Sequence, residues 1–169
     1  FPTRRSSDLV SNLTGWGGNG GISGTMNYST SGNGGSGGGI FGGGVLTNCT
    51  LVGNSRRRGG GQPGSPGYGG SGGGICGGAT VVSCTIVSNT AGFGLLPVYN
   101  GSGGGVCGAG FCLNSIVAFN NGLTNGPGPD VWGTFNSLGD NLIGATNDSS
   151  GFTAPGDLTG SNSSPLDPK

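Results

Sequence analysis

The chain has no histidine, no glutamate and few charges of either sign: its 169 residues include six Lys or Arg and six acidic residues, all of them Asp. Without histidine, the most common general base and the most common metal ligand are missing. A formal net charge of zero gives no indication of nucleic acid or an anionic membrane surface as a partner. No apolar run is long enough to insert into a membrane, and no stretch keeps the apolar period of a helix.

Glycine is the residue in excess, with 45 copies. A Gly-rich composition without a period is typical of disordered segments, but this composition is periodic. Three blocks of 19 residues align without a gap, and their first residues lie 35 and 31 positions apart: Ser36–Asn54, Ser71–Asn89 and Ser102–Asn120. Each starts with Ser-Gly-Gly-Gly and an aliphatic residue and closes with Asn. Constant blocks joined by variable spacers predict stacked coils.

Each block is predicted to contain two or three short strands, because its β-branched and aliphatic residues form short runs bounded by Gly and Asn. A coil this short cannot bury its apolar side chains alone. Stacked coils would pair each strand with its copies above and below, about 4.8 Å away. The sequence therefore predicts an all-β solenoid, a parallel β-helix with Gly-rich coils and long loops on one face.

The asparagine that closes each block is predicted to form a ladder at one corner of the coils. Asn54, Asn89 and Asn120 would lie over one another. Asparagine tolerates left-handed backbone geometry, and its side-chain amide can hydrogen-bond the same amide of the next coil. Its other role is that of a plain turn former, and the two roles are compatible.

The cysteines follow the same register. Cys76 and Cys107 share one position of the block, and Cys49 and Cys84 share another. Stacked Cα atoms about 4.8 Å apart fall within the range that a disulfide requires, so the register permits two bridges between coils. A column of buried thiols is the alternative, and the odd fifth cysteine favours it. No Cys-x-x-Cys motif indicates zinc.

The spacers 13–35, 55–70 and 90–101 leave the coil at the same position and predict a loop face. Their aromatic residues suit stacking on sugars or contact with a protein partner, unless they fold down over the flank of the coils. The candidate ligand-binding residues are Trp16, Tyr28, Tyr68, Phe93 and Tyr99. The arginine triplet 56–58 is predicted to be a solvated loop tip rather than a nucleic-acid site, since it stands alone in a neutral chain.

The acidic residues after the last block offer little for catalysis. Asp130 and Asp140 are weak candidates for calcium ligands, because calcium prefers oxygen donors. In a stretch rich in Gly, Asn and Ser, however, Asp is more often a turn residue. Glycoside hydrolysis usually needs two carboxylates that face each other across the scissile bond, and no stacked pair of this kind is indicated. We expect no catalytic residue, no metal and no cofactor.

The ends of the chain differ from the blocks. Residues 1–9 resemble the translation of a sequencing-adapter oligonucleotide and are expected to carry no function. Residues 10–12 match residues 87–89, so we expect the natural sequence to start here, at the end of an earlier coil, with the N-terminal part of the gene missing. Coils are expected over residues 10–121 and terminal coils over residues 122–169.

Several short motifs near the C-terminus are specific enough to indicate a family resemblance. They are Asn-Ser-Ile-Val-Ala (114–118), Gly-Pro-Asp-Val (128–131), Gly-Thr-Phe (133–135), Ser-Leu-Gly (137–139), Asn-Leu-Ile-Gly (141–144) and Pro-Leu-Asp-Pro (165–168). With the Gly-rich blocks, they make residues 10–169 similar to a bacterial family, the choice-of-anchor Q domain proteins with right-handed parallel β-helix repeats. The resemblance implies a right-handed β-helix that is secreted or exposed on the cell surface. It also implies a more distal segment that anchors some members, and the chain is expected to stop before it.

Taken together, the residues and the resemblance predict a non-enzymatic extracellular or cell-surface β-helix, an adhesin-like protein or a stalk. Its loop face would bind a polysaccharide or a surface protein. A carbohydrate-active enzyme, a polysaccharide lyase or glycoside hydrolase with its catalytic coils in the missing N-terminal part, is the alternative, because fold alone does not decide function. A spacer without a ligand is a third possibility.

Overall fold

The computed structural model describes residues 7–17, 22–23, 27–28, 31–60, 66–123 and 127–169. Nearly all regular structure in these residues is β, with one 3₁₀ turn, η1 (Pro97–Tyr99). The strands are β1 (Ser7–Val10), β2 (Ile22–Ser23), β3 (Asn27–Tyr28), β4 (Ile40–Phe41), β5 (Gly44–Thr47), β6 (Cys49–Val52), β7 (Ile75–Cys76), β8 (Ala79–Val82), β9 (Thr85–Val87), β10 (Val106–Cys107), β11 (Gly110–Leu113), β12 (Ile116–Ala118), β13 (Val131–Gly139), β14 (Leu142–Ile143), β15 (Ser149–Ser150) and β16 (Leu158–Thr159).

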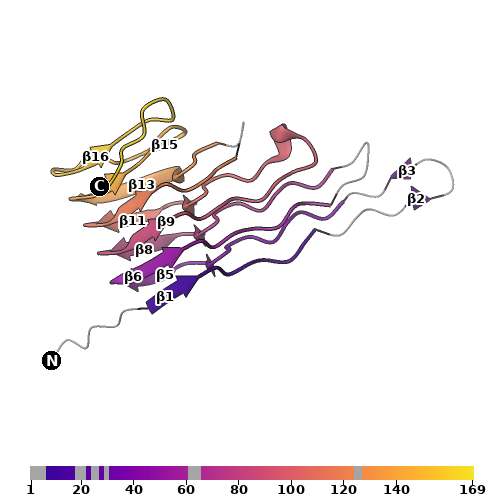
Figure 1. The fold of residues 1–169 in the computed structure, drawn as a ribbon, viewed down its shortest axis with the longest axis horizontal. Helices are drawn as coiled ribbons and strands as arrows, with labels where there is room; N and C mark the ends of the chain where they lie inside the picture. The colour runs from indigo at the N-terminus through magenta and orange to yellow at the C-terminus, as the bar shows by residue number, and fades with distance from the viewer. Residues whose placement is uncertain (1–6, 18–21, 24–26, 29–30, 61–65, 124–126) are drawn as a thin grey trace.

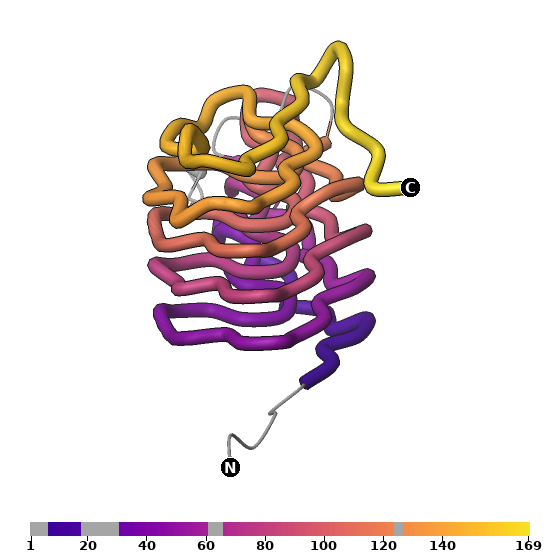
Figure 2. The backbone as a smooth tube through the Cα atoms, turned by 90° about the vertical axis from the view of Figure 1, so that its left-hand side faces the viewer, coloured from indigo at the N-terminus to yellow at the C-terminus, as the bar shows by residue number. Residues whose placement is uncertain are grey.

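Successive blocks lie on top of one another, and each strand pairs with the equivalent strand of the next block (Figures 1 and 2). A six-stranded sheet has the order β1-β6-β9-β12-β14-β16, with parallel pairs throughout. Its register places Leu51 beside Ile86 and Ile86 beside Val117, the same position of three blocks. The fold is therefore all-β and parallel, as the repeats predicted. The short β2–β3 pair is antiparallel.

The second sheet curls around the interior because one long strand joins its two halves. On one side β4, β7 and β10 stack, and on the other β5, β8 and β11 stack. Strand β13 pairs with β10 through Val131 and Trp132 and with β11 from Phe135 onward. Between these two stretches, Gly133 has a φ of 126°. In each preceding block this corner separates two strands. In β13, a single strand of nine residues continues around it.

Inward-facing apolar side chains form continuous columns in the core. Leu51, Ile86, Val117 and Ile143 make one column, and each is at most 1% exposed. Other columns contain Leu46, Val81 and Cys112, and Ile75, Val106 and Val131. Cys112 therefore occupies an aliphatic position. Because burial of each such aliphatic side chain is worth about 1.5–3 kcal/mol, the stacked columns supply the stabilisation that one coil could not.

The residue before each ladder asparagine, and not the asparagine itself, has left-handed backbone geometry. The residues with positive φ at this corner are Gly53 (65°), Ser88 (56°) and Phe119 (55°). The asparagine that follows each of them is absent from the left-handed region. This corrects the expectation that backbone tolerance places asparagine here. The side-chain amide is the reason for its presence.

Part of the N-terminal segment 1–9, which was expected to carry no function, belongs to the described fold. Strand β1 pairs with β6, with Ser7 beside Cys49 and Leu9 beside Leu51. Leu9 also packs against the core cluster. An edge strand needs only backbone donors and acceptors and an apolar residue at the inward position, and residues 7–10 meet both conditions. Whatever their origin, residues 7–9 belong to the first described strand.

The spacers project from one side of the coil stack, one above another (Figure 1). Parallel bridges join their first residues, from Leu13 to Ser55 and from Ser55 to Thr90. Farther out, Gly17 N donates to Arg58 O at 2.9 Å. The backbone hydrogen bonding of the coils thus continues into the spacers, which form a layered extension of the stack.

Glycine permits this layering because the backbones approach too closely for side chains. A Cβ atom added at Gly70 would meet the carbonyl oxygen of Gly35 and Nη1 of Arg56. One added at Gly34 would meet the carbonyl oxygen of Arg57. At these described positions of the spacers, glycine is therefore a packing requirement.

Candidate functional site

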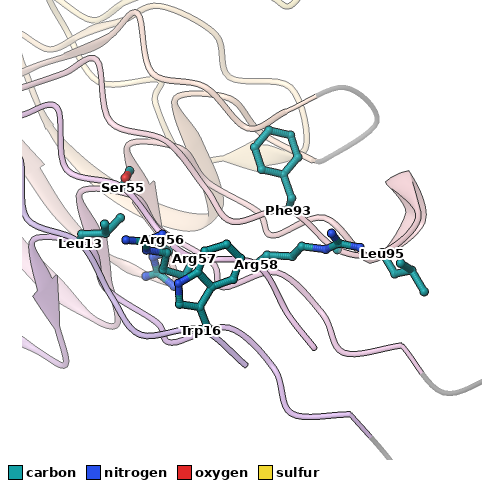
Figure 3. Close-up of a pocket in the computed structure, with 9 residues that line it drawn as sticks. Leu13, Trp16, Ser55, Arg56, Arg57, Arg58, Phe93 and Leu95 are labelled. Carbon is teal, nitrogen blue, oxygen red and sulfur yellow. The ribbon is translucent and has the colours of Figure 1, made fainter. Parts of the chain in front are cut away.

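The first parts of three successive spacers enclose a groove of about 630 Å³ (Figure 3). Its lining residues are Leu13, Trp16, Ser55, Arg56, Arg57, Arg58, Phe93, Gly94 and Leu95. Because each spacer leaves the coil at the same position, residues far apart in the sequence lie together here. The lining combines exposed apolar side chains with three arginines, and none of the described residues that line the groove is acidic.

Trp16 and Arg57 form a stacked pair in this groove. Arg57 Cζ lies 4.7 Å from the centroid of the indole ring, and Trp16 is 65% exposed. A cation–π contact at an exposed site is worth about 0.5–1 kcal/mol, enough to favour one orientation of the ring. The backbone N–H of Arg57 donates to Thr14 Oγ1 at 3.1 Å and fixes the two spacers relative to each other. The pair therefore presents a pre-oriented aromatic ring beside a guanidinium.

Arg56 is buried, which corrects the prediction of a solvated loop tip for the whole triplet. It is only 5% exposed, while Arg58 is exposed. Its Nε donates to Gly72 O at 2.6 Å and its Nη1 donates to Gly35 O at 3.1 Å, while Nη2 has no hydrogen-bond partner among the described residues. Burial lowers its pKa to about 10. The side chain turns inward because Gly-rich corners leave two carbonyls open to it.

The five aromatic residues predicted to bind a ligand do not all lie in one groove. Trp16 and Phe93 line the groove, and Phe93 is 55% exposed. Tyr68 and Tyr99 contact each other edge to face, with ring centroids 4.9 Å apart, and Tyr68 lines a separate hollow of about 360 Å³. Tyr28 lies in β3, and its side chain is outside the described part of the structure. The groove at Trp16 is the place where aromatic and cationic groups meet.

The asparagine ladder is continuous through the coils. Asn89 Oδ1 accepts hydrogen bonds from Asn54 N and Nδ2, both at 2.9 Å. Asn120 Oδ1 accepts the same pair of bonds from Asn89, also at 2.9 Å. Asn54 and Asn89 are fully buried. The ladder begins one coil earlier, where Asn12 donates to Asn54.

A second ladder runs along another corner: it contains the predicted stack of Cys49 and Cys84 and extends it through three residues that were not predicted to belong to it. Its members are Cys49, Cys84, Ser115, Asn141 and Asp157, and the backbone N–H of each donates to the side chain of the next. Cys49, Cys84 and Ser115 share one position of the aligned blocks, so the alignment contained the signal. Because thiol, hydroxyl and amide can all accept from an N–H group, the residue type changes along the ladder without breaking it.

Carboxylates take the last rung of both ladders, and this explains two of the acidic residues. Asp130 Oδ1 accepts from Asn120 N at 2.8 Å and from Asn120 Nδ2 at 2.9 Å, and Asp130 is 3% exposed. Asp140, the other calcium candidate, is exposed at a corner with a φ of 57°. Within the described ranges, no three His, Cys, Asp or Glu residues gather as a metal site would require.

The carboxyl groups of Asp130 and Asp157, which form the last rungs of the two ladders, have opposite pKa shifts. Burial raises the pKa of Asp130, and N–H donors from Asn120 and Ala145 offset this only in part. At Asp157 burial also raises the pKa, but hydrogen bonds from Ser137, Asn141 and Ala154 outweigh it, so the pKa is lowered. Asp130 therefore binds a proton more readily in the folded chain than in the unfolded chain.

An Asp130→Asn variant tests this shift. A raised pKa in the folded state means that the protonated carboxyl contributes stability, which is lost as the pH rises through the folded pKa. As the pH falls from 7 to below about 4, wild type is therefore expected to gain stability relative to Asp130→Asn. Urea unfolding at several pH values measures this difference. Parallel curves for the two proteins would show that Asp130 titrates normally.

The chain matches no protein-family model, no curated protein and no solved structure. In the part of the chain that the structure describes, no helix has the length and apolar character to span a membrane.

Proposed function

We propose that this chain is a right-handed parallel β-helix, secreted or exposed on a bacterial surface, that binds acidic polysaccharide in the loop groove and catalyses no reaction. Two arguments support the handedness: parallel strands joined by crossover connections are nearly always right-handed, and the C-terminal motifs resemble those of right-handed β-helix repeats. The observation that carries the proposed binding is the stacked Trp16–Arg57 pair in a groove with three arginines and no acid.

The chemistry of the groove suits an acidic sugar. An exposed indole offers an apolar face on which the C–H side of a pyranose ring can pack. The guanidinium groups of Arg57 and Arg58 have a planar donor geometry that matches a carboxylate or sulfate. Since Arg57 already stacks on Trp16, a sugar on the ring would bring its acidic group within reach of a cation. A neutral polymer would gain only the stacking contact.

The described carboxylates support a binding role over the enzymatic alternative. Asp130 and Asp157 each accept hydrogen bonds from the ladder residue of the preceding coil. Neither is among the residues that line the groove. A glycosidase would need a pair of carboxyl groups on either side of the bound sugar. The groove offers stacking and charge but no acid or base.

Binding to polygalacturonate, measured by isothermal titration calorimetry, tests the proposal. We expect Trp16→Ala and Arg58→Ala each to weaken binding about tenfold, since each loses a contact of about 1–1.5 kcal/mol. Phe41→Ala is the matched control, because Phe41 is 73% exposed in β4 and lies outside the groove. Binding should also weaken as salt is added. Equal binding to neutral mannan, or unchanged binding by both groove variants, would refute an acidic-glycan site.

The non-enzymatic part of the proposal has its own measurement. Incubation of the protein with plant and bacterial polysaccharides is expected to release no new reducing ends and no unsaturated sugars. Release of either product, abolished by heat denaturation, would replace the binding role with an enzymatic one.

A further inference from the structure

Cys76 and Cys107 lie side by side at a partly buried corner of the coils. They are register partners in the adjacent parallel strands β7 and β10, and their Sγ atoms are 3.3 Å apart. A disulfide needs Sγ atoms about 2.05 Å apart and Cα atoms about 4.4–6.8 Å apart, a range that includes neighbouring strands. Small side-chain rotations would therefore join the two sulfurs without moving the backbone.

The charged group near this pair is the buried Arg56. Its Nε donates to the carbonyl of Gly72, which belongs to the same corner as Cys76, and its positive charge acts on both thiols. Nη2 of Arg56 is buried without a hydrogen-bond partner among the described residues. Among the described residues, no carboxylate acts on the charge of either thiol. A thiolate is thus the nearby anion that would compensate the buried cation.

The two thiols differ in environment. The two thiols share a hydrogen bond in which either sulfur can donate, and the hydroxyl of Ser36 is a further hydrogen-bond partner of Cys76. Cys76 is half-buried, while Cys107 is only 5% exposed. The hydrogen bond with Cys107 and, to a smaller extent, Arg56 and Ser36 lower the pKa of Cys76 against the opposing effect of burial. The same hydrogen bond and burial raise the pKa of Cys107. Cys76, which is the more accessible thiol and has the Ser36 hydroxyl as an additional partner, is therefore assigned as the nucleophile of the pair.

We infer that Cys76 and Cys107 form a peroxide-reducing dithiol, with Cys76 as the attacking sulfur, Cys107 as the resolving sulfur and Arg56 as the positioning cation. The Cys76 thiolate attacks one oxygen of hydrogen peroxide, the O–O bond breaks, and the leaving hydroxide takes a proton to form water. Cys76 is then a sulfenic acid. Cys107 attacks the Cys76 sulfur, the S–O bond breaks and a second water leaves with the Cys107 proton. Two thiols are oxidised to one disulfide and one peroxide is reduced to two waters.

Cys49 and Cys84 provide an internal control within the same chain. They also stack in successive coils, with Cys49 N donating to Cys84 Sγ at 3.4 Å. No arginine acts on Cys84, and burial raises its pKa. Treatment of the reduced chain with hydrogen peroxide at pH 7, followed by alkylation and peptide mass spectrometry, is expected to form the Cys76–Cys107 bond at least about tenfold faster than a Cys49–Cys84 bond. Equal rates for the two pairs would overturn the inference.

Two variants assign the roles. In Cys107→Ser, peroxide should leave a sulfenic acid on Cys76 that dimedone traps, while Cys76→Ser should leave Cys107 unreacted. Trapping on Cys107 instead would reverse the assignment and overturn it. In Arg56→Met, shown to be folded by circular dichroism, the pH midpoint of the reaction should be higher than in wild type, which loss of packing alone would not cause. An unchanged midpoint would remove Arg56 from the site. If Arg56→Met does not fold, the comparison of the two cysteine pairs still decides the inference.

Discussion

Replacing Asn89 with alanine is expected to lower the free energy of unfolding by about 3–5 kcal/mol. The side chain is fully buried, and its Nδ2 donates to Leu51 O, Val87 O and Asn120 Oδ1. Its Oδ1 accepts two bonds from Asn54. Alanine would leave the N–H of Asn54 unpaired in the interior, and an unsatisfied buried donor costs about 1–3 kcal/mol. The effect is large because one side chain serves three coils.

Urea unfolding followed by circular dichroism measures the loss. Asn136→Ala is the matched control, because Asn136 lies exposed in β13, and a change within about 0.5 kcal/mol is expected there. Asn89→Asp should also destabilise the fold at pH 7, since it keeps the acceptor but removes both N–H donors and buries a charge. If Asn89→Ala unfolds at the same urea concentration as Asn136→Ala, the ladder does not stabilise the coils.

Gly70→Ala is expected to destabilise the chain by about 2–3 kcal/mol, which is the usual cost of overpacking a rigid site. The added methyl group would meet the carbonyl of Gly35 in the neighbouring spacer, and Nη1 of Arg56. Both are held by hydrogen bonds, so neither can move away freely. Relief of the clash would separate two spacers and disturb the groove as well.

Gly15→Ala is the control for this substitution. Gly15 also lies in a spacer, but a Cβ atom there has nothing within 4 Å. Gly15→Ala should therefore be neutral or stabilise the chain by up to about 1 kcal/mol, through a less flexible unfolded state. Thermal unfolding of both variants measures the contrast. Equal melting temperatures would show that the spacers are not packed against each other in solution.

The repeat positions were the most predictable part of the molecule. Blocks of constant length fix which residues stack, so the parallel pairing and the alignment of Asn54, Asn89 and Asn120 followed from spacing alone. The prediction placed left-handed backbone geometry on the asparagine, whereas the residue before the asparagine has it. Ser88 and Phe119 stand at the position of Gly53 in the later blocks. Because they are not glycine, their residue type gave no indication of the positive φ that all three share.

Features that depend on non-repeating segments could not be predicted. Asp130 continues the asparagine ladder only ten residues after Asn120, a spacing unlike the 31 and 35 residues between earlier rungs. The burial of Arg56 depends on carbonyls of Gly35 and Gly72 that the sequence does not place near it. The groove at Trp16 likewise combines three spacers of different length and composition.

The two ladders restrict which duplications and insertions in the gene are compatible with the fold. Duplication of a complete block adds one acceptor and one donor to each ladder, so the new rung fits between its neighbours. An insertion of any other length within a block would leave a mismatched rung in every column at once. Insertions in a spacer break no rung but alter the groove. The number of coils and the shape of the groove can thus change separately. Arg56 belongs to both the groove and the surroundings of the paired thiols, so a change there would affect the two together.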